Sequence, residues 1–181
     1  ITDNGDIVGY VARHIWNKQE IDSHNRKAKT SGNYRLLRYR NSTDNDFVKL
    51  LYNHDAIIEN ETDTVIIVEG IFDVIALTRK LELYDNTRIA VVATFGKKIS
   101  STQIFKLQQK GIETVIIGYD GDAVEAIKKT ATELKPYFEV MITDIENPYK
   151  DWEDLSCEEI YFTFSYRLKT PLEYSLSKIQ E

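Results

Sequence analysis

Two apolar runs that end in acidic residues constrain this chain more than any other feature. Residues 65–68 are Val-Ile-Ile-Val and lead directly into Glu69. Residues 115–117 are Val-Ile-Ile and are soon followed by Asp120 and Asp122. β-Branched runs of this kind are typical of strands buried on both faces of a parallel sheet. Because open α/β sheets form their sites beyond the carboxyl ends of such strands, the pattern predicts that these carboxylates share one cleft.

From residue 63 onward, apolar strand-like segments alternate with amphipathic segments. This order predicts right-handed crossover units, and so an α/β fold with a mostly parallel sheet and helices on its faces. Ser100 with Gln103 predicts a capping box at one helix start, and Gly111 predicts a left-handed helix end. The expected strands are 64–69, 88–93, 113–119 and 138–143, and the expected helices are 72–83, 100–110 and 122–135.

Residues 1–62 differ from this pattern and predict a separate small α+β subdomain. The expected elements are short strands at 6–11 and 34–39, a polar loop between them and a helix near 45–53. We therefore expect three parts: the subdomain over 1–62, the sheet domain over 63–150, and a tail over 151–181 that packs on the core.

The net charge of −6 hides an asymmetry along the chain. Residues 13–40 contain eight Lys/Arg against Glu20 and Asp22, which leaves fifteen basic and twenty-seven acidic residues elsewhere. A basic stretch in an acidic protein suits a polyanion bound to one subdomain, although a solvated surface segment has the same composition.

The composition excludes several classes of protein. No run of about 18 apolar residues could span a bilayer, and the amino end lacks a signal-peptide pattern, so we expect a cytoplasmic protein without a membrane partner. A single cysteine, Cys157, permits neither an internal disulfide nor a zinc ribbon. The chain begins at Ile1 and its single methionine is Met141, so we expect a piece of a longer product.

The acidic residues at the strand ends are candidate ligands for a divalent cation. Asp120 and Asp122 flank Gly121, which lets the backbone bend sharply, and oxygen-only pairs suit Mg²⁺ or Mn²⁺. Asp and Gly are also ordinary turn residues. Glu69 strengthens the metal interpretation, because a dry, unpaired carboxylate is costly and like-charged neighbours raise its pKa. The alternative is a strand-end glutamate that caps the next helix.

Further charged residues lie near these strand ends in the sequence. Asp73 follows Glu69 and Gly70, and Asp151 with Glu153 comes after the fourth strand, where a solvated acidic loop is an alternative. Lys97 and Lys98 precede a helix start, where a phosphate would meet both lysines and backbone amides, or both are solvated loop residues.

The ordered set of motifs resembles the TOPRIM domain of DnaG-type bacterial and phage primases. The resemblance covers roughly residues 6–155, and its specificity lies in the order of the motifs rather than in any one of them. The matching segments are Ile7-Val8-Gly9-Tyr10-Val11-Ala12-Arg13, Arg38-Tyr39-Arg40-Asn41-Ser42, Glu69-Gly70-x-x-Asp73, Ala93-Thr94-Phe95-Gly96, Tyr119-Asp120-Gly121-Asp122 and Lys150-Asp151-Trp152-Glu153.

The resemblance implies a TOPRIM-type Rossmann-like sheet and a core that makes short RNA primers on single-stranded DNA by metal-dependent nucleotidyl transfer from ribonucleoside triphosphates. It implies Mg²⁺ or Mn²⁺ as cofactor and a replicative helicase as a partner reached through flanking domains. The residues it carries over are Glu69, Asp120, Asp122 and Asp151 as metal or catalytic carboxylates, Arg13, Arg38 and Asn41 as nucleotide or template contacts, and Gly70, Asp73 and Gly121 in support.

The chain departs from the family pattern at three positions. Arg38 stands where the family commonly has lysine, and a guanidinium delivers its charge differently. Trp152 and Glu153 replace a proline and a second aspartate, which affects the last carboxylate near the metal. These departures indicate a divergent primase, of a phage or mobile element.

Three alternatives use the same fold. A nuclease of the overcoming-lysogenization type would use the acidic residues to place a water, a topoisomerase fragment would need a tyrosine from another domain, and a binding module would retain the fold without catalysis. The basic upstream subdomain favours the primase among them.

Overall fold

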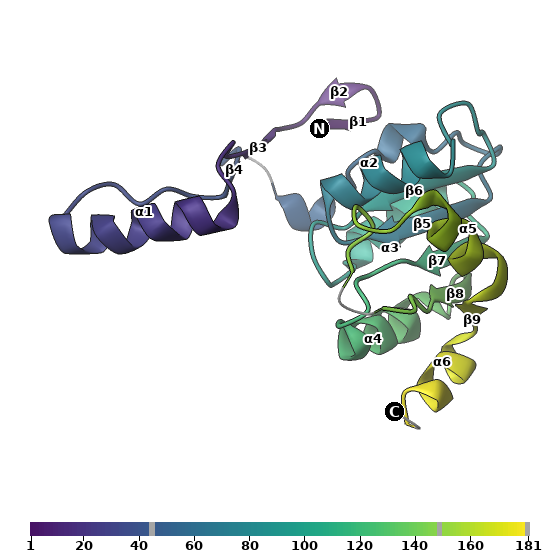
Figure 1. The fold of residues 1–181 in the computed structure, drawn as a ribbon. Helices are drawn as coiled ribbons and strands as arrows, with labels where there is room; N and C mark the ends of the chain where they lie inside the picture. Colours follow the sequence, from purple (N-terminus) through teal and green to yellow (C-terminus); the bar gives the residue numbers. More distant parts are fainter. Residues whose placement is uncertain (44–45, 148–149, 180–181) are drawn as a thin grey trace. The chain divides into compact units, whose positions relative to one another are not determined.

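The computed structural model describes residues 1–43, 46–147 and 150–179 (Figure 1). The chain divides into two compact units, and each is described by itself. The first comprises Ile1 with Asp6–Asn45, and the second comprises Thr2–Gly5 with Asp46–Glu181. The division differs from the boundary expected at 62/63, so the domain limits drawn from the sequence stay a prediction.

The second unit is built on a five-stranded sheet. Its strands are β5 (Thr64–Val68), β6 (Ile89–Ala93), β7 (Thr114–Ile117), β8 (Glu139–Thr143) and β9 (Leu168–Lys169), in the order β6-β5-β7-β8-β9. The first four strands are parallel, and β9 pairs antiparallel with β8. The predicted mostly parallel α/β sheet is therefore confirmed, and the tail adds the antiparallel edge.

Helices cover both faces of this sheet, because successive β-branched residues point to opposite sides. Val65 and Ile67 face α3 (Ser101–Gln109), α4 (Val124–Leu134) and α6 (Pro171–Ser177). Ile66 and Val68 face α2 (Ile71–Lys80) and α5 (Cys157–Tyr166). The result is a three-layer arrangement with two separate apolar cores (Figure 1).

The predicted capping signals are confirmed at α3. Ser100 Oγ accepts from the backbone N–H of Gln103, and the Gln103 side chain accepts from Ser100 N–H. Gly111 has a φ of 81°, the left-handed conformation expected for a helix end. The tail helix α5 is capped in the same way by Ser156 and Glu159, a signal present in the sequence but not used to predict it.

Residues 46–62 pack with the sheet of the second unit. The helix predicted near 45–53 is wrong for the described residues, which form the 3₁₀ turns η1 (Phe47–Lys49) and η2 (His54–Ala56). Tyr52 instead makes two backbone hydrogen bonds to Ala93 of the edge strand β6, and this pairing requires extended backbone where the helix was expected.

The amino-terminal segment contributes to both units. Strand β1 (Thr2–Asp3) belongs to the second unit, where the Asp3 carboxylate forms an ion pair with Lys106. The first unit contains β2 (Asp6–Ile7), β3 (Val11–Arg13), α1 (Lys18–Ser31) and β4 (Tyr39–Asn41), with β3 and β4 antiparallel.

Helix α1 lies where the sequence was expected to form a polar loop. Asn17 and Glu20 form a capping box at its start, and Gly32 ends it with a φ of 68°. A capping box satisfies backbone N–H groups that would otherwise lack partners, so a mostly polar segment forms a regular helix. The strand predicted at 34–39 is displaced and forms as β4.

None of the helices in the described part of the chain combines the length and apolar character that a membrane span requires.

Trp152 closes the core beneath the carboxyl end of β7. Its side chain is fully buried, and its Nε1–H donates to the Gly118 carbonyl at 2.7 Å. Gly118 is needed for this approach, because a Cβ there would lie 3.5 Å from the indole and 3.3 Å from Val68. The tryptophan that replaces the family's proline is therefore a core residue.

We predict that Trp152→Phe lowers the free energy of unfolding by about 2 kcal/mol, because it leaves a cavity and an unpaired Gly118 carbonyl. Urea unfolding followed by circular dichroism measures the change. The matched control is Trp16→Phe, at an exposed position, which should change it by less than about 0.5 kcal/mol. Equal effects of the two substitutions would contradict this role for Trp152.

Candidate metal centre

The candidate site lies where the strand order of the sheet reverses. β5 is followed by β6 on one side, and the chain then crosses to β7 on the other side of β5. Such a reversal leaves a crevice beyond the carboxyl ends of the two central strands, where open α/β sheets bind ligands. Glu69 follows β5 directly, and Asp120 lies three residues after the end of β7.

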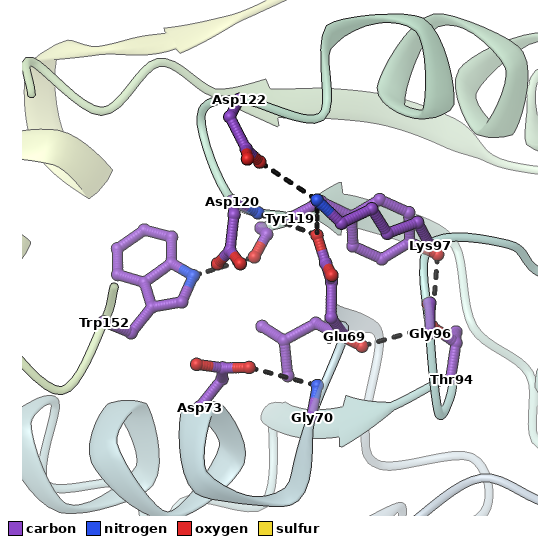
Figure 2. Close-up of polar contacts among 12 residues, drawn as sticks. Glu69, Gly70, Asp73, Thr94, Gly96, Lys97, Tyr119, Asp120, Asp122 and Trp152 are labelled. Atoms are coloured by element: carbon purple, nitrogen blue, oxygen red, sulfur yellow. Dashed lines mark hydrogen bonds and ion pairs between the residues drawn. The ribbon is translucent and has the colours of Figure 1, made fainter. Parts of the chain in front are cut away.

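Glu69 and Asp120 are in direct contact at this edge. The backbone N–H of Asp120 donates to Glu69 Oε1 at 3.2 Å, and the Glu69 carbonyl accepts from Gly96 N–H at 3.0 Å. The Glu69 side chain is 15% exposed. Figure 2 shows the carboxylates of Glu69, Asp73 and Asp120 directed toward the same space, with Trp152 beside it.

Asp73 reaches the site from the first turn of α2. Its Oδ2 accepts from the backbone N–H of Gly70 at 3.0 Å, which caps the start of the helix. A Cβ on Gly70 would lie 3.1 Å from the same oxygen. Glycine at position 70 therefore lets the carboxylate approach the strand end closely.

Asp122 and Lys97 form the outer side of the site. Lys97 Nζ lies 3.0 Å from Asp122 Oδ1 and 3.7 Å from Glu69 Oε1, between the two carboxylates (Figure 2). The turn that presents Asp122 is closed by a hydrogen bond from Ala123 N–H to the Asp120 carbonyl, with Gly121 inside it. An ammonium group thus lies among the carboxylates of the site.

The loop that carries Lys97 is held in an uncommon backbone conformation. Phe95 has a φ of 59° and Gly96 a φ of 142°. Thr94 Oγ1 donates to the Gly96 carbonyl at 2.6 Å, and Gly96 N–H bonds to Glu69. A non-glycine residue at positive φ costs free energy and persists where surrounding contacts demand it, which is common at functional sites.

Burial and mutual repulsion raise the pKa values of the inner carboxylates. Burial, followed by the charge of Asp120, raises the pKa of Glu69 from 4.5 to about 7. The same two causes raise the pKa of Asp73 from 3.8 to about 7. Burial and the charge of Asp151 raise the pKa of Asp120. One lysine therefore does not neutralise the cluster.

Asp144, which follows β8, provides a contrast. Its carboxylate lies 2.7 Å from Lys169 Nζ, 3.3 Å from Lys178 Nζ and 3.5 Å from Arg167 Nη2. Burial alone would raise its pKa, but the bond to Lys169 and the charge of Lys178 lower it overall. The chain thus supplies cations where a carboxylate is structural and leaves Glu69, Asp73 and Asp120 with a deficit of positive charge.

This donor set fits a hard divalent cation. Within residues 1–43, 46–147 and 150–179, no three His, Cys, Asp or Glu side chains already surround one point at metal-binding distance. Mg²⁺ nevertheless needs one or two protein carboxylates and completes its shell with water and substrate phosphates. Carboxylates with raised pKa values and only oxygen donors match that requirement.

The site is also lined by three residues that were not among the predicted site residues. Tyr119 is buried, its hydroxyl lies 3.2 Å from Thr94 Oγ1, and burial raises its pKa to about 12. Trp152 forms one side, as described above. Thr94 and Tyr119 both lie within sequence motifs that matched the family, at Ala93-Thr94-Phe95-Gly96 and directly before Asp120, so their motifs indicated a place at the site.

The remaining predicted site residues divide between the two units. Asp151 is exposed, but its charge raises the pKa of both Asp73 and Asp120, so it lies within electrostatic range of the cluster. Lys98 is exposed. Arg13, Arg38 and Asn41 belong to the first unit, and their roles stay predictions.

The comparisons with known proteins agree on one family. Residues 66–156 match the family model described as Toprim-like. The chain is 32% identical to the DNA primase of Mycoplasma genitalium over 160 residues, which cover 84% of this chain and 22% of that protein. It is 34% identical to the DNA primase of Mycoplasma pneumoniae over 132 residues, which cover 68% of this chain and 20% of that protein. The chain spans about a fifth of the length of these relatives.

We predict that the metal-free protein loses stability as the pH rises from 5 to 8. The folded-state pKa of Glu69 is raised from 4.5 to about 7, so folding favours its protonated form, and that contribution is present below pH 4.5 and lost as the pH passes 7. Glu69→Gln should reduce the loss without removing it, because Asp73 keeps its own raised pKa. The variant should be more stable than the native chain at pH 8 by about 2 kcal/mol.

Urea unfolding in a chelating buffer at several pH values measures this effect. Asp63→Asn, at the opposite end of β5, serves as the control and should leave the pH dependence unchanged. The interpretation fails if Glu69→Gln and the native chain show parallel pH profiles.

We predict that Lys97→Met destabilises the metal-free protein by about 0.5–1 kcal/mol at pH 8, because it removes positive charge from between Glu69 and Asp122. Lys98→Met is the matched control and should have no effect. Added Mg²⁺ should reduce the difference between the two variants, because a bound divalent ion supplies the missing charge. Thermal unfolding with and without Mg²⁺ measures this, and an undiminished difference would be the contrary result.

Proposed function

The chain belongs to the Toprim-like family, and on that basis we propose that it is the catalytic core of a DNA primase, which makes short RNA primers on single-stranded DNA. The proposed reaction is metal-dependent nucleotidyl transfer from ribonucleoside triphosphates. The observation that carries the proposal is a group of insufficiently neutralised carboxylates, Glu69, Asp73 and Asp120. They lie where the strand order of the sheet reverses, which we call the switch point.

We assign the metal-holding role to Glu69, Asp120, Asp122 and Asp151. When bound, Mg²⁺ or Mn²⁺ supplies positive charge that favours deprotonation of a primer 3′-hydroxyl and offsets the charge on leaving pyrophosphate. Asp73 and Gly70 keep the helix start close to Glu69, and Gly121 shapes the turn between Asp120 and Asp122. Trp152 and Tyr119 exclude water from the inner side of the carboxylates.

The basic residues complete the proposed active site. Lys97 would exchange its carboxylate partners for a triphosphate once the carboxylates are neutralised, and Lys98 would add a second phosphate contact from the same loop. Arg13 and Asn41, on the antiparallel strands β3 and β4 of the first unit, and Arg38, directly before β4, would contact nucleotide or template phosphates. A replicative helicase is the proposed protein partner in the cell.

The DNA primases of two Mycoplasma species support this proposal over the alternatives. Both are identical to this chain at about a third of the aligned positions, and the alignment with the Mycoplasma genitalium protein extends beyond the Toprim-like segment. Since that alignment covers 84% of the chain, the likeness also includes residues outside the acidic site.

We predict that Asp120→Asn lowers primer synthesis at least about 100-fold, because it removes a carboxylate from the metal centre while keeping the size of the side chain. The assay measures incorporation of labelled ribonucleotides on a single-stranded DNA template with Mg²⁺ or Mn²⁺. Asp63→Asn is the matched control and should retain activity, because Asp63 lies at the opposite end of β5 from the site.

Two outcomes would contradict the proposal. Equal activity of Asp120→Asn and Asp63→Asn would show that the acidic site is not used. Metal-dependent cleavage of the template without nucleotide incorporation would indicate a nuclease instead.

A further inference from the structure

The first unit exposes a tryptophan between its strand β3 and its helix α1. Trp16 lies between β3 and α1, and 41% of the residue is exposed. The unit is small, and the buried residues of its helix are Ile21 and Ala28. An exposed indole offers a large, flat apolar face together with a polar N–H, which suits contact with a ligand.

Trp16 is held in place by its neighbours. Its ring makes edge-to-face contacts with His14, at 5.2 Å between centroids, and with His24, at 5.8 Å. Its backbone N–H donates to His14 Nδ1 at 3.0 Å, and Asn17 next to it caps α1. Edge-to-face partners fix a ring without covering its whole face, so the exposed indole is preorganised.

A second aromatic residue, Tyr39, begins β4 and lies close to two cations. Arg13 Cζ lies 6.0 Å and Arg38 Cζ 5.7 Å from the centre of the Tyr39 ring. The segment before β4 is joined to the segment that leads to Trp16 by a hydrogen bond of 2.8 Å from His14 N–H to the Arg38 carbonyl. The segment that carries the indole and the segment that carries Arg38 are therefore neighbours in the fold of this unit.

The charge of the unit matches an anionic ligand. Residues 6–43 contain eight Lys/Arg and three Asp/Glu. An aromatic ring beside guanidinium groups offers a stacking surface for a base together with contacts for the adjacent phosphate.

We propose that Trp16 is a base-stacking site for single-stranded nucleic acid, with Arg13 and Arg38 of the same unit as phosphate contacts. The ligand must be single-stranded, because duplex bases are already stacked on one another. The inference rests on the proposed function in taking a nucleic acid as the ligand, and it deepens that function by assigning a base contact to a surface otherwise described through phosphates.

Trp16 fluorescence tests the proposal directly. The chain has two tryptophans, and Trp152 is fully buried, so Trp16 is the one that a bound base can quench. The protein is titrated in chelator, without nucleotide triphosphates, with twelve-nucleotide thymidine DNA, uridine RNA and an abasic backbone of equal length. The DNA and RNA arms distinguish template from primer as the preferred strand.

The expected result is that the DNA or RNA oligonucleotide quenches the fluorescence of the native chain, and that the abasic backbone quenches it little. In Trp16→Phe, where Trp152 alone emits, the oligonucleotide should cause no quenching. Trp16→Leu should weaken binding about tenfold, the loss of one stacked base, while Trp16→Tyr retains most of it. The salt dependence should stay unchanged in Trp16→Leu and become shallower in Arg38→Ala, because only the latter loses a phosphate contact.

Three results would overturn the proposal. These are equal affinity for the abasic and the base-carrying strand, native affinity of Trp16→Leu, and no fluorescence change with any oligonucleotide, which would favour a protein surface as the partner. Circular dichroism checks that each variant is folded. The binding assay contains no divalent ion, so it does not depend on the metal centre. Loss of the stacking site and loss of primer synthesis can therefore be observed separately.

Discussion

Unbalanced negative charge at the ends of two buried strands is the constraint on which the rest of the site depends. Glu69 and Asp120 follow the adjacent central strands β5 and β7, where the strand order reverses, and Asp73 joins them from the next helix. Burial makes each charge costly, and proximity makes each cost larger. Asp144, paired with three cations of the same unit, shows that the fold can neutralise a carboxylate fully. The deficit at Glu69 is consequently a specific feature of the switch point.

The parts around the carboxylates are explained by this deficit. Lys97 offers partial compensation from an exposed loop, so its charge can be replaced by that of a divalent ion without disturbing the core. The left-handed Phe95 and the hydrogen bond from Gly96 to Glu69 hold that loop against the strand end. Trp152 seals the other side through Gly118. A stable scaffold thus supports a site whose charges are incomplete until a ligand binds.

The sequence predicted the sheet and the clustering of acidic residues because β-branched runs and strand-end carboxylates follow simple periodic rules. Glu69 and Asp120 meet for that reason. The position of Lys97 was not predictable, because it depends on the φ values of Phe95 and Gly96. Trp152 gave no local sign of burial, since its partner Gly118 lies 34 residues away. Helix α1 was missed although Asn17 and Glu20 carried a capping signal, because its few apolar residues suggested a loop.

Binding of Mn²⁺ to the protein, followed by electron paramagnetic resonance at pH 7.5, tests the central claim most directly. The account predicts saturable binding that weakens at least about tenfold when a carboxylate of the switch point is neutralised by Glu69→Gln, and stays unchanged in Asp144→Asn, whose carboxylate already has its cations. Binding that is absent from the native chain, or equal in both variants, would contradict the claim that these carboxylates form a cation site.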